Sequence, residues 1–249
     1  MFAVPGDHGS FEILVAIYAY AIQIFTDFSG YTDIAIGCAL LLGIRLPQNF
    51  ASPYAATSLQ DFWRRWHMSL SRWLRDYLYI PLGGSRGGRW LTGRNVMITF
   101  VLGGLWHGAA WTFVVWGAIH GTWLVVERLL GLERRARTQV WTVIRWAVTF
   151  NIVCLSWVFF RAESLGDGLT LLRRLFTAGG DAPLVTPLLV AVIAGAVTWQ
   201  FAPRSWLGWA REAFVRVGPV PQIATVAVAL VIIDGLGPKG VAPFIYFQF

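Results

Sequence analysis

The sequence predicts an all-α fold, a multi-pass bundle of transmembrane helices. Hydrophobic residues make up 56% of the 249-residue chain, and charged residues only 13%. Soluble globular chains carry roughly 25% charged residues, so this chain is poor in the groups that keep a surface in water. The 14 tryptophans point the same way, because indole rings favour the boundary between lipid and water.

Apolar stretches of helical length recur along the chain. A helix needs about 20 mainly apolar residues to cross the hydrocarbon core. The stretches that come close are residues 11–25, 33–44, 96–105, 111–126, 141–160, 187–201 and 220–236. The second is short and follows a polar turn that we expect around Gly30, and short stretches could be re-entrant or broken. We expect about five to seven membrane-embedded helices in one domain that covers residues 1–249.

The stretch between residues 57 and 79 differs from these spans. Ser58 followed by Asp61 fits a helix N-terminal capping pattern. Apolar residues then recur at helical spacing and arginines lie mostly elsewhere around the helix; the apolar set is Phe62, Trp66, Leu70, Trp73, Leu74 and Tyr77. The pattern predicts an amphipathic interfacial helix near residues 58–79, ended by Pro81. Alternatively, this helix is an anchor that only packs against the bundle.

Charge and cysteine content exclude several classes of function. The net charge of +7 suits an anionic membrane surface or a nucleic acid. No basic run is interleaved with nucleic-acid-binding motifs, so we expect membrane lipids as partners and no nucleic acid. Cys38 and Cys154 lie in apolar stretches and are expected to be small buried residues. No cluster of His, Cys, Asp and Glu has zinc-ligand spacing, so we expect no metal.

Histidine is the residue type that could carry chemistry here. His107 lies between glycines in an apolar segment, where an ionisable group is costly and suggests a site. Its imidazole can take a proton near neutral pH, although a histidine bonded to a neighbouring helix remains the alternative. His67 either lines an opening or sits at headgroup level.

The remaining histidines give weaker signals. His8 lies near a polar terminus, and we expect it to be solvated. His120 follows His107 by 13 residues, which is about 220° around a continuous helix, so the two rings would share no face. A break at Gly108 or Gly117 could change this, and spacing alone predicts no pairing.

Five segments carry a family resemblance. They are residues 27–33 (DFSGYTD), 60–71 (QDFWRRWHMSLS), 73–84 (WLRDYLYIPLGG), 103–108 (GGLWHG) and 244–249 (FIYFQF). Together they resemble the bacterial branch of the membrane-bound O-acyltransferase family, specifically its alginate O-acetyltransferase membrane subunits. The resemblance covers nearly the whole chain. Family proteins carry more helices before the first of these segments, so we expect the chain to correspond to the C-terminal half.

The resemblance implies acyl transfer to a hydroxyl of a cell-surface polysaccharide such as alginate. The family's catalytic histidine corresponds to His107, and the second histidine of its site to His67. A tunnel through the bundle is implied, and we expect Trp66, Trp106 and Arg75 to line or anchor it. A partner acyltransferase outside the cytoplasmic membrane is also implied.

The substrates and the class of activity leave alternatives open. The acyl donor is expected to be acetyl-CoA or another acyl carrier, held as a substrate, with no bound cofactor. The acceptor could instead be peptidoglycan or teichoic acid. A non-catalytic transporter or scaffold subunit would use the same buried histidines as a proton relay or for packing. In each case we expect a multi-pass protein of the bacterial inner or cytoplasmic membrane.

Overall fold

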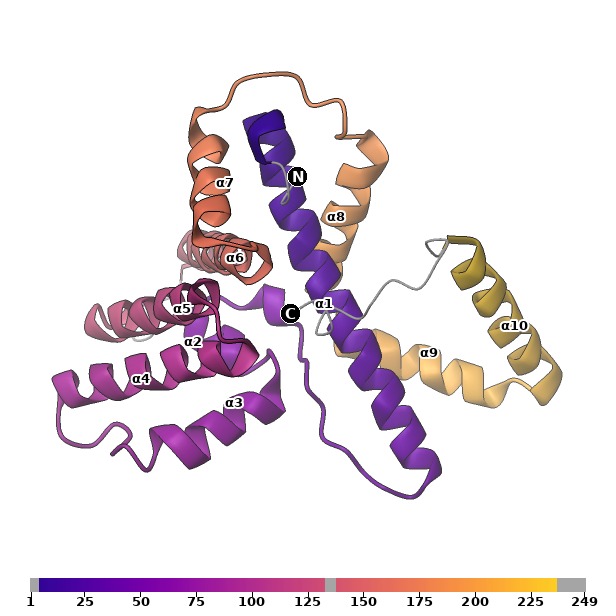
Figure 1. The fold of residues 1–249 in the computed structure, drawn as a ribbon. Helices are drawn as coiled ribbons and strands as arrows, with labels where there is room; N and C mark the ends of the chain where they lie inside the picture. Colours follow the sequence, from indigo (N-terminus) through magenta and orange to yellow (C-terminus); the bar gives the residue numbers. More distant parts are fainter. Residues whose placement is uncertain (1–4, 133–137, 237–249) are drawn as a thin grey trace. The chain divides into compact units, whose positions relative to one another are not determined.

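A computed structural model describes residues 5–132 and 138–236, and the regular secondary structure in this part of the chain is all helical (Figure 1). The all-α prediction is therefore confirmed for these residues. The helices are α1 (Ser10–Leu41), α2 (Leu59–Trp63), α3 (Met68–Leu74), α4 (Arg89–His107), α5 (Trp111–Leu129), α6 (Gln139–Arg161), α7 (Leu165–Thr177), α8 (Pro187–Trp199), α9 (Arg204–Arg216) and α10 (Pro219–Leu236).

The chain forms two compact units, residues 1–200 and residues 201–249. In the described residues, two helices are long and apolar enough to cross a membrane, α1 and α6. The other apolar segments also form helices, α4, α5, α8 and α10. The count of five to seven embedded helices and the single domain both stay predictions. The C-terminal segment 244–249 lies outside the described residues.

The expected turn around Gly30 is absent, because α1 runs through it without a break. Polar side chains in this stretch bond back to the helix itself. The Thr32 hydroxyl donates to the carbonyl oxygens of Phe28 at 3.1 Å and Ser29 at 2.9 Å. Such internal bonds let a hydroxyl sit in a helix without a separate partner. The prediction of a separate short helix over 33–44 was therefore wrong.

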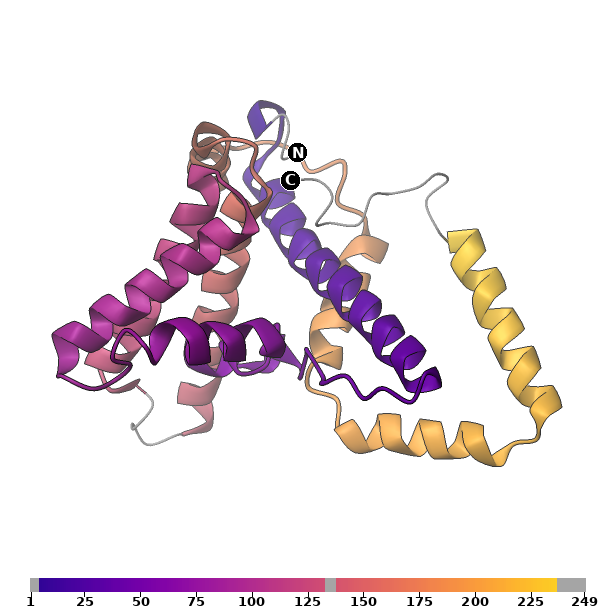
Figure 2. The same cartoon turned by 60° about the horizontal axis from the view of Figure 1, so that its bottom comes forward.

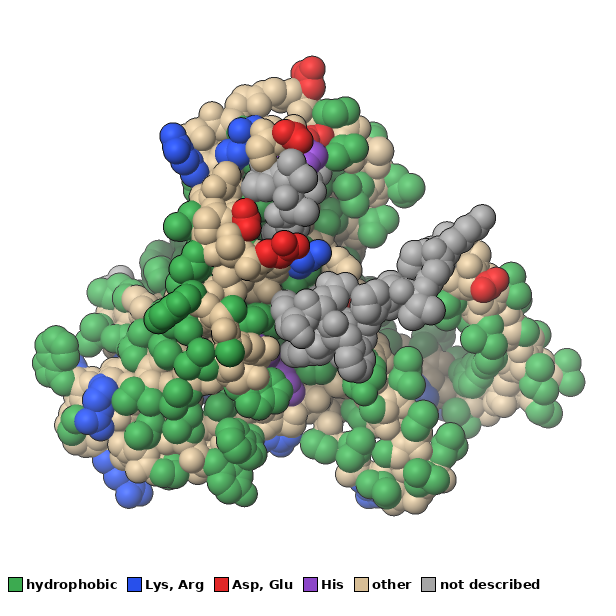
Figure 3. All heavy atoms as spheres, in the orientation of Figure 1, with side chains coloured by type: hydrophobic (Ala, Val, Ile, Leu, Met, Phe, Trp, Pro, Cys, Tyr) green, Lys and Arg blue, Asp and Glu red, His purple; other side chains and the backbone are tan. Residues whose placement is uncertain are grey.

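Helices α4 and α5 form an antiparallel hairpin and lie side by side in both ribbon views (Figures 1 and 2). Glycines let their backbones touch: Gly104 faces the carbonyl of Phe113, and Gly117 faces that of Phe100. Gly117 and Gly121 form a Gly-xxx-Gly pair, which is typical of closely packed membrane helices. Apolar side chains cover the outer face of this hairpin (Figure 3).

The predicted continuous helix over 58–79 is broken into α2, α3 and a π-helical turn over Arg75–Tyr79. The expected cap is present, since the backbone N–H of Asp61 donates to Ser58 Oγ at 3.0 Å. The break comes at His67, whose backbone is left-handed with φ of 40°. There, Asn49 supplies two acceptors: its carbonyl oxygen for Met68 N–H and its side-chain oxygen for Ser69 N–H, both at 3.0 Å.

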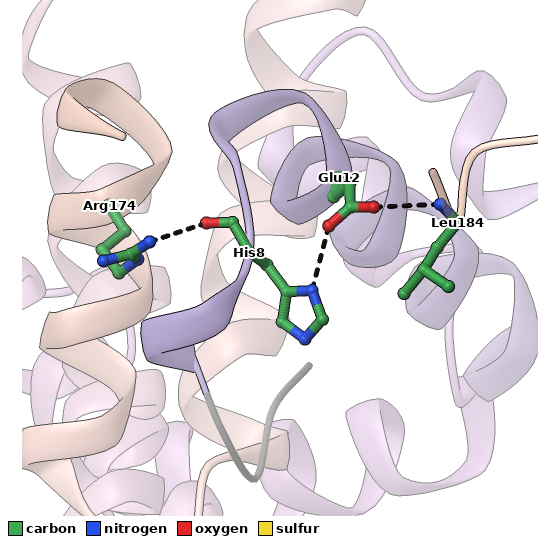
Figure 4. Close-up of polar contacts among 4 residues, drawn as sticks. All are labelled: His8, Glu12, Arg174 and Leu184. Atoms are coloured by element: carbon green, nitrogen blue, oxygen red, sulfur yellow. Dashed lines mark hydrogen bonds and ion pairs between the residues drawn. The ribbon is translucent and has the colours of Figure 1, made fainter. Parts of the chain in front are cut away.

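The start of α1 is held by a hydrogen-bonded cluster, which corrects the expectation that His8 is solvated (Figure 4). His8 Nδ1 lies 2.9 Å from Glu12 Oε2, and the other Glu12 oxygen accepts from the backbone N–H of Leu184 at 3.0 Å. Arg174 of α7 donates to the His8 carbonyl oxygen at 3.0 Å. Glu12 is buried, so these contacts supply the partners that a buried carboxylate needs. The cluster ties α1 to α7 and to the loop before α8.

The sequence prediction missed two short helices, α7 and α9. Each has 13 residues and mixes charged with apolar positions, so neither is an apolar run of membrane length. In the C-terminal unit, the Gln222 side chain donates to the carbonyl oxygens of Phe214 and Val217, both at 3.0 Å. These bonds fix the turn between α9 and α10.

Candidate active site

His107 is the last residue of α4, and aromatic rings from three helices surround it. The centroid of its ring lies 5.2 Å from that of Trp116 on α5 and 5.0 Å from that of Phe160 on α6. Trp106, its neighbour in the chain, lies at 5.0 Å. The contacts with Trp116 and Phe160 are edge-to-face, a preferred geometry for aromatic pairs. This arrangement holds the imidazole in one orientation; His107 as a whole residue is half-buried, and its Nδ1 atom is shielded from solvent.

His67 also lies near Trp106. The His67 ring centroid is 6.4 Å from that of Trp106, and it meets Phe28 of α1 edge-on at 4.8 Å. The Trp106 side chain is exposed, with 57% of its residue surface accessible. The structure therefore places both His67 and His107 near Trp106, and their roles in a substrate site stay predictions. Two half-buried imidazoles beside an accessible indole can hold and deprotonate a hydroxyl-bearing substrate.

Trp66 lies in the packed aromatic core rather than at an opening. It is only 3% exposed, and its ring stacks on Phe62 at 5.5 Å and meets Trp157 at 5.1 Å. The surrounding rings belong to α1, α2, α6 and the segment before α2; they include Phe25, Phe50, Tyr54, Phe62 and Trp157. Its predicted role in substrate binding stays a prediction, and this position suits an anchor of the fold.

Arg75 is exposed and starts the π-helical turn after α3. Its guanidinium bonds the Asp76 carboxylate at 2.7 Å, and this hydrogen bond lowers the pKa of Asp76. No contact that the structure describes joins Arg75 to either histidine, unlike Trp106. Its assignment to the substrate site stays a prediction.

Two buried charged residues position the segment that leads to His67, and sequence reasoning missed both. The Glu127 carboxylate of α5 accepts the backbone N–H groups of Leu59 at 2.8 Å and Gln60 at 3.3 Å. Arg145 of α6 donates from Nε to the carbonyl oxygen of Thr57 at 3.1 Å. Both side chains are less than 10% exposed. A charged side chain in an apolar helix was the available signal, because such residues are costly without partners.

Acidification should destabilise the wild-type protein more than a His67→Asn variant. Burial lowers the pKa of the His67 imidazole to about 4, whereas an unfolded histidine titrates near about 6.5. The unfolded chain therefore binds more protons between these values, and stability falls as pH drops from about 6.5 to about 4. The slope has a ceiling of about 1.4 kcal/mol per pH unit.

Thermal unfolding in detergent at pH 7.5 and pH 5 measures this difference. Asparagine tolerates the left-handed backbone but does not titrate, so all other acid effects are common to both proteins. Equal losses of melting temperature in the two proteins would contradict the burial of a neutral His67.

The helices around His67 and His107 belong to a known class of protein. The chain belongs to the membrane-bound O-acyltransferase family, whose family model matches residues 10–165. The matched region contains α1 to α6, with both histidines and Trp106. The resemblance drawn from the sequence is therefore confirmed, and the family, like the two apolar helices α1 and α6, places the chain among membrane proteins.

Named relatives act on three polymers. A probable alginate O-acetylase AlgI from Azotobacter vinelandii is 40% identical over 268 residues, covering 93% of this chain and 53% of the relative. A peptidoglycan O-acetyltransferase from Helicobacter pylori is 47% identical over 163 residues, covering 65% of this chain and 31% of the relative. A teichoic acid D-alanyltransferase from Bacillus subtilis is 31% identical over 164 residues, covering 60% of this chain and 41% of the relative. The chain thus spans about half the length of the alginate O-acetylase it matches.

Proposed function

We propose that this protein transfers an acyl group to a hydroxyl of a cell-surface polysaccharide such as alginate, and that this acyl group is acetyl. The observation that carries the proposal is the position of Trp106, whose ring lies near the imidazoles of both His67 and His107, with centroid distances of 6.4 and 5.0 Å. The family membership and the identity to an alginate O-acetylase support the same reaction. In the proposal, the protein is a multi-pass protein of the bacterial inner membrane that works with a partner acyltransferase outside it.

In the proposed reaction, His107 acts as the general base. Its imidazole takes the proton of the acceptor hydroxyl while that oxygen bonds to the acyl carbon. The bond from the acyl carbon to the donor's sulfur or oxygen then breaks, and the proton passes from His107 to the leaving group. Acetyl-CoA or another acyl carrier serves as the donor. Such proton transfer contributes about 10² to 10⁴-fold to the rate, and the held geometry of the two substrates supplies the remainder.

In the same proposal, His67 and Trp106 bind the substrates. His67 orients the acceptor or assists proton movement, because its neutral imidazole can accept and donate a hydrogen bond. Trp106 offers an exposed apolar ring face beside both histidines. Sugar rings and acyl chains both pack on such faces. Trp66 and Arg75 are proposed to anchor the walls of the substrate path.

Acceptor choice is tested by expressing this protein, together with a partner acyltransferase, in a host that lacks its own alginate O-acetylase. The ester content of purified alginate, peptidoglycan and teichoic acid is then measured. We expect acetyl esters on alginate. Esters only on peptidoglycan would favour the reaction of the Helicobacter pylori relative instead. Normal membrane levels of protein without esters on any of the three polymers would contradict acyl transfer, and altered solute uptake would then favour a transporter.

A further inference from the structure

His120 is completely buried in the middle of α5, and both of its ring nitrogens have partners. Trp63 Nε1 lies 3.2 Å from His120 Nδ1, and Ser156 Oγ lies 2.8 Å from His120 Nε2. The accessible surface of His120 is 0%. An indole N–H can only donate, so His120 Nδ1 must be the acceptor.

The partners fix the tautomer of His120 completely. The Ser156 hydroxyl donates to the carbonyl oxygen of Val153 at 2.7 Å. Since that proton is engaged, Ser156 Oγ accepts from His120 Nε2–H. The ring is therefore neutral and protonated on Nε2. A second proton on Nδ1 would face the N–H of Trp63, donor against donor.

The bonded ring joins the elements that support both site histidines. Trp63 ends α2, only four residues before His67 at the break. The Trp116 ring of α5 contacts both His120 and His107, with its centroid 4.8 Å from that of His120 and 5.2 Å from that of His107. The Trp116 ring thus connects His120 to His107 by direct packing. The short segment from Trp63 to His67 connects His120 to the second site histidine.

We propose that His120 is a positioning residue for acyl transfer, which it supports through the hydrogen-bonded chain Trp63–His120–Ser156. This inference rests on the proposed function. His120 takes no part in proton transfer, because both nitrogens are committed and no substrate reaches a ring with no exposed surface. Its role is to hold α2 against α5 and α6, so that Trp116 and the break at His67 keep their places.

The test removes the two bonds of His120 separately. Trp63→Phe keeps an aromatic ring and deletes only the donor to Nδ1, whereas Ser156→Ala deletes only the acceptor for Nε2–H. His120→Asn keeps an acceptor near Nδ1, and His120→Leu keeps neither bond. Each variant is compared with wild type in kcat, KM and the pH profile of acyl transfer, with its melting temperature measured alongside.

We expect His120→Leu to lower kcat by about 10²-fold, as a small displacement of catalytic groups does. His120→Asn should recover most of that loss, and Trp63→Phe should lower kcat in wild type but hardly at all in His120→Leu. The pH profile should be unchanged in every variant. If His120→Leu does not accumulate, the Trp63→Phe and Ser156→Ala variants decide the question by the same criteria.

Two results would overturn the proposal. Equal loss of activity in folded His120→Asn and His120→Leu, with a shifted pH profile, would show that the imidazole itself does chemistry. Wild-type kcat in all four variants would show that the bonded chain positions nothing. Full activity in His107→Gln would instead contradict the proposed function, and it leaves the effect of His120 on kcat separately measurable.

Discussion

Replacing Gly117 by alanine is expected to prevent the protein from folding to its native packing. A Cβ at Gly117 would overlap the backbone carbonyl of Phe100, and the Cα of Val101 would lie only 3.2 Å away. Backbone atoms cannot rotate aside as a flexible side chain can, so α4 and α5 would have to move apart. Overpacking in a core costs about 1–3 kcal/mol and occasionally more, and a backbone clash lies at the upper end.

The same helix pair offers a second variant, and α1 offers a matched control. Gly104→Ala creates the reciprocal clash with the Phe113 carbonyl, so it should behave like Gly117→Ala. Gly37 lies in α1 with nothing within 4 Å of its Cβ position. Gly37→Ala should therefore be neutral or stabilising, because alanine favours helices by up to about 1 kcal/mol over glycine.

The folding and stability of all three variants are compared by their protein levels in membranes and their melting temperatures in detergent. Loss of folded protein in the Gly117 and Gly104 variants, with normal Gly37→Ala, is the expected pattern. A normal melting temperature for Gly117→Ala would mean that α4 and α5 do not pack by close backbone contact.

Sequence patterns were sufficient to predict the positions of helices that consist of long apolar runs. Residues 141–160 predicted α6 to within two residues at either end, because a long apolar run has few alternatives inside a membrane. The stretches at 111–126 and 220–236 likewise correspond to α5 and α10. The polar residues near Gly30 misled the prediction, because a serine or threonine hydroxyl can bond within its own helix as readily as it can end one.

The break at His67 could not be predicted from local pattern, because its cause lies elsewhere in the chain. The apolar spacing over 58–79 favours one continuous helix, yet Asn49 supplies the acceptors for the first N–H groups of α3. A left-handed residue costs about 1–2 kcal/mol. Contacts that offset this cost come from tertiary structure, which periodicity does not record.

In the candidate site, too, local features could be predicted from the sequence and tertiary contacts could not. Flanking glycines and an apolar context marked His107 from sequence alone, and these are local features. The partners of His120 are 57 and 36 residues away in the chain, so its spacing from His107 carried no information about its role. Trp66 and Trp106 occupy similar motifs, yet one is buried in the core and the other is exposed beside the histidines. Only the packing of α2, α4 and α6 distinguishes them.

Replacing His107 by glutamine should lower acyl transfer by about 10² to 10⁴-fold, which is the contribution expected of a general base. Glutamine fills a similar volume and can hydrogen-bond, but it cannot take a proton at neutral pH. The rings of Trp116 and Phe160 would still enclose the side chain. The loss should therefore fall on kcat, with little change in melting temperature or membrane level.

Trp106→Phe serves as the matched control for that variant. It preserves an aromatic ring near the two histidines and removes no titrating group, so its effect should appear mainly in KM. Acetyl ester content of the polymer and initial rates in membranes would measure both variants. Near-normal kcat in a folded His107→Gln protein would exclude His107 as the base, because the proposed reaction assigns removal of the hydroxyl proton to His107. Loss of kcat in both variants to the same extent would instead point to disturbed packing around α4 as the common cause.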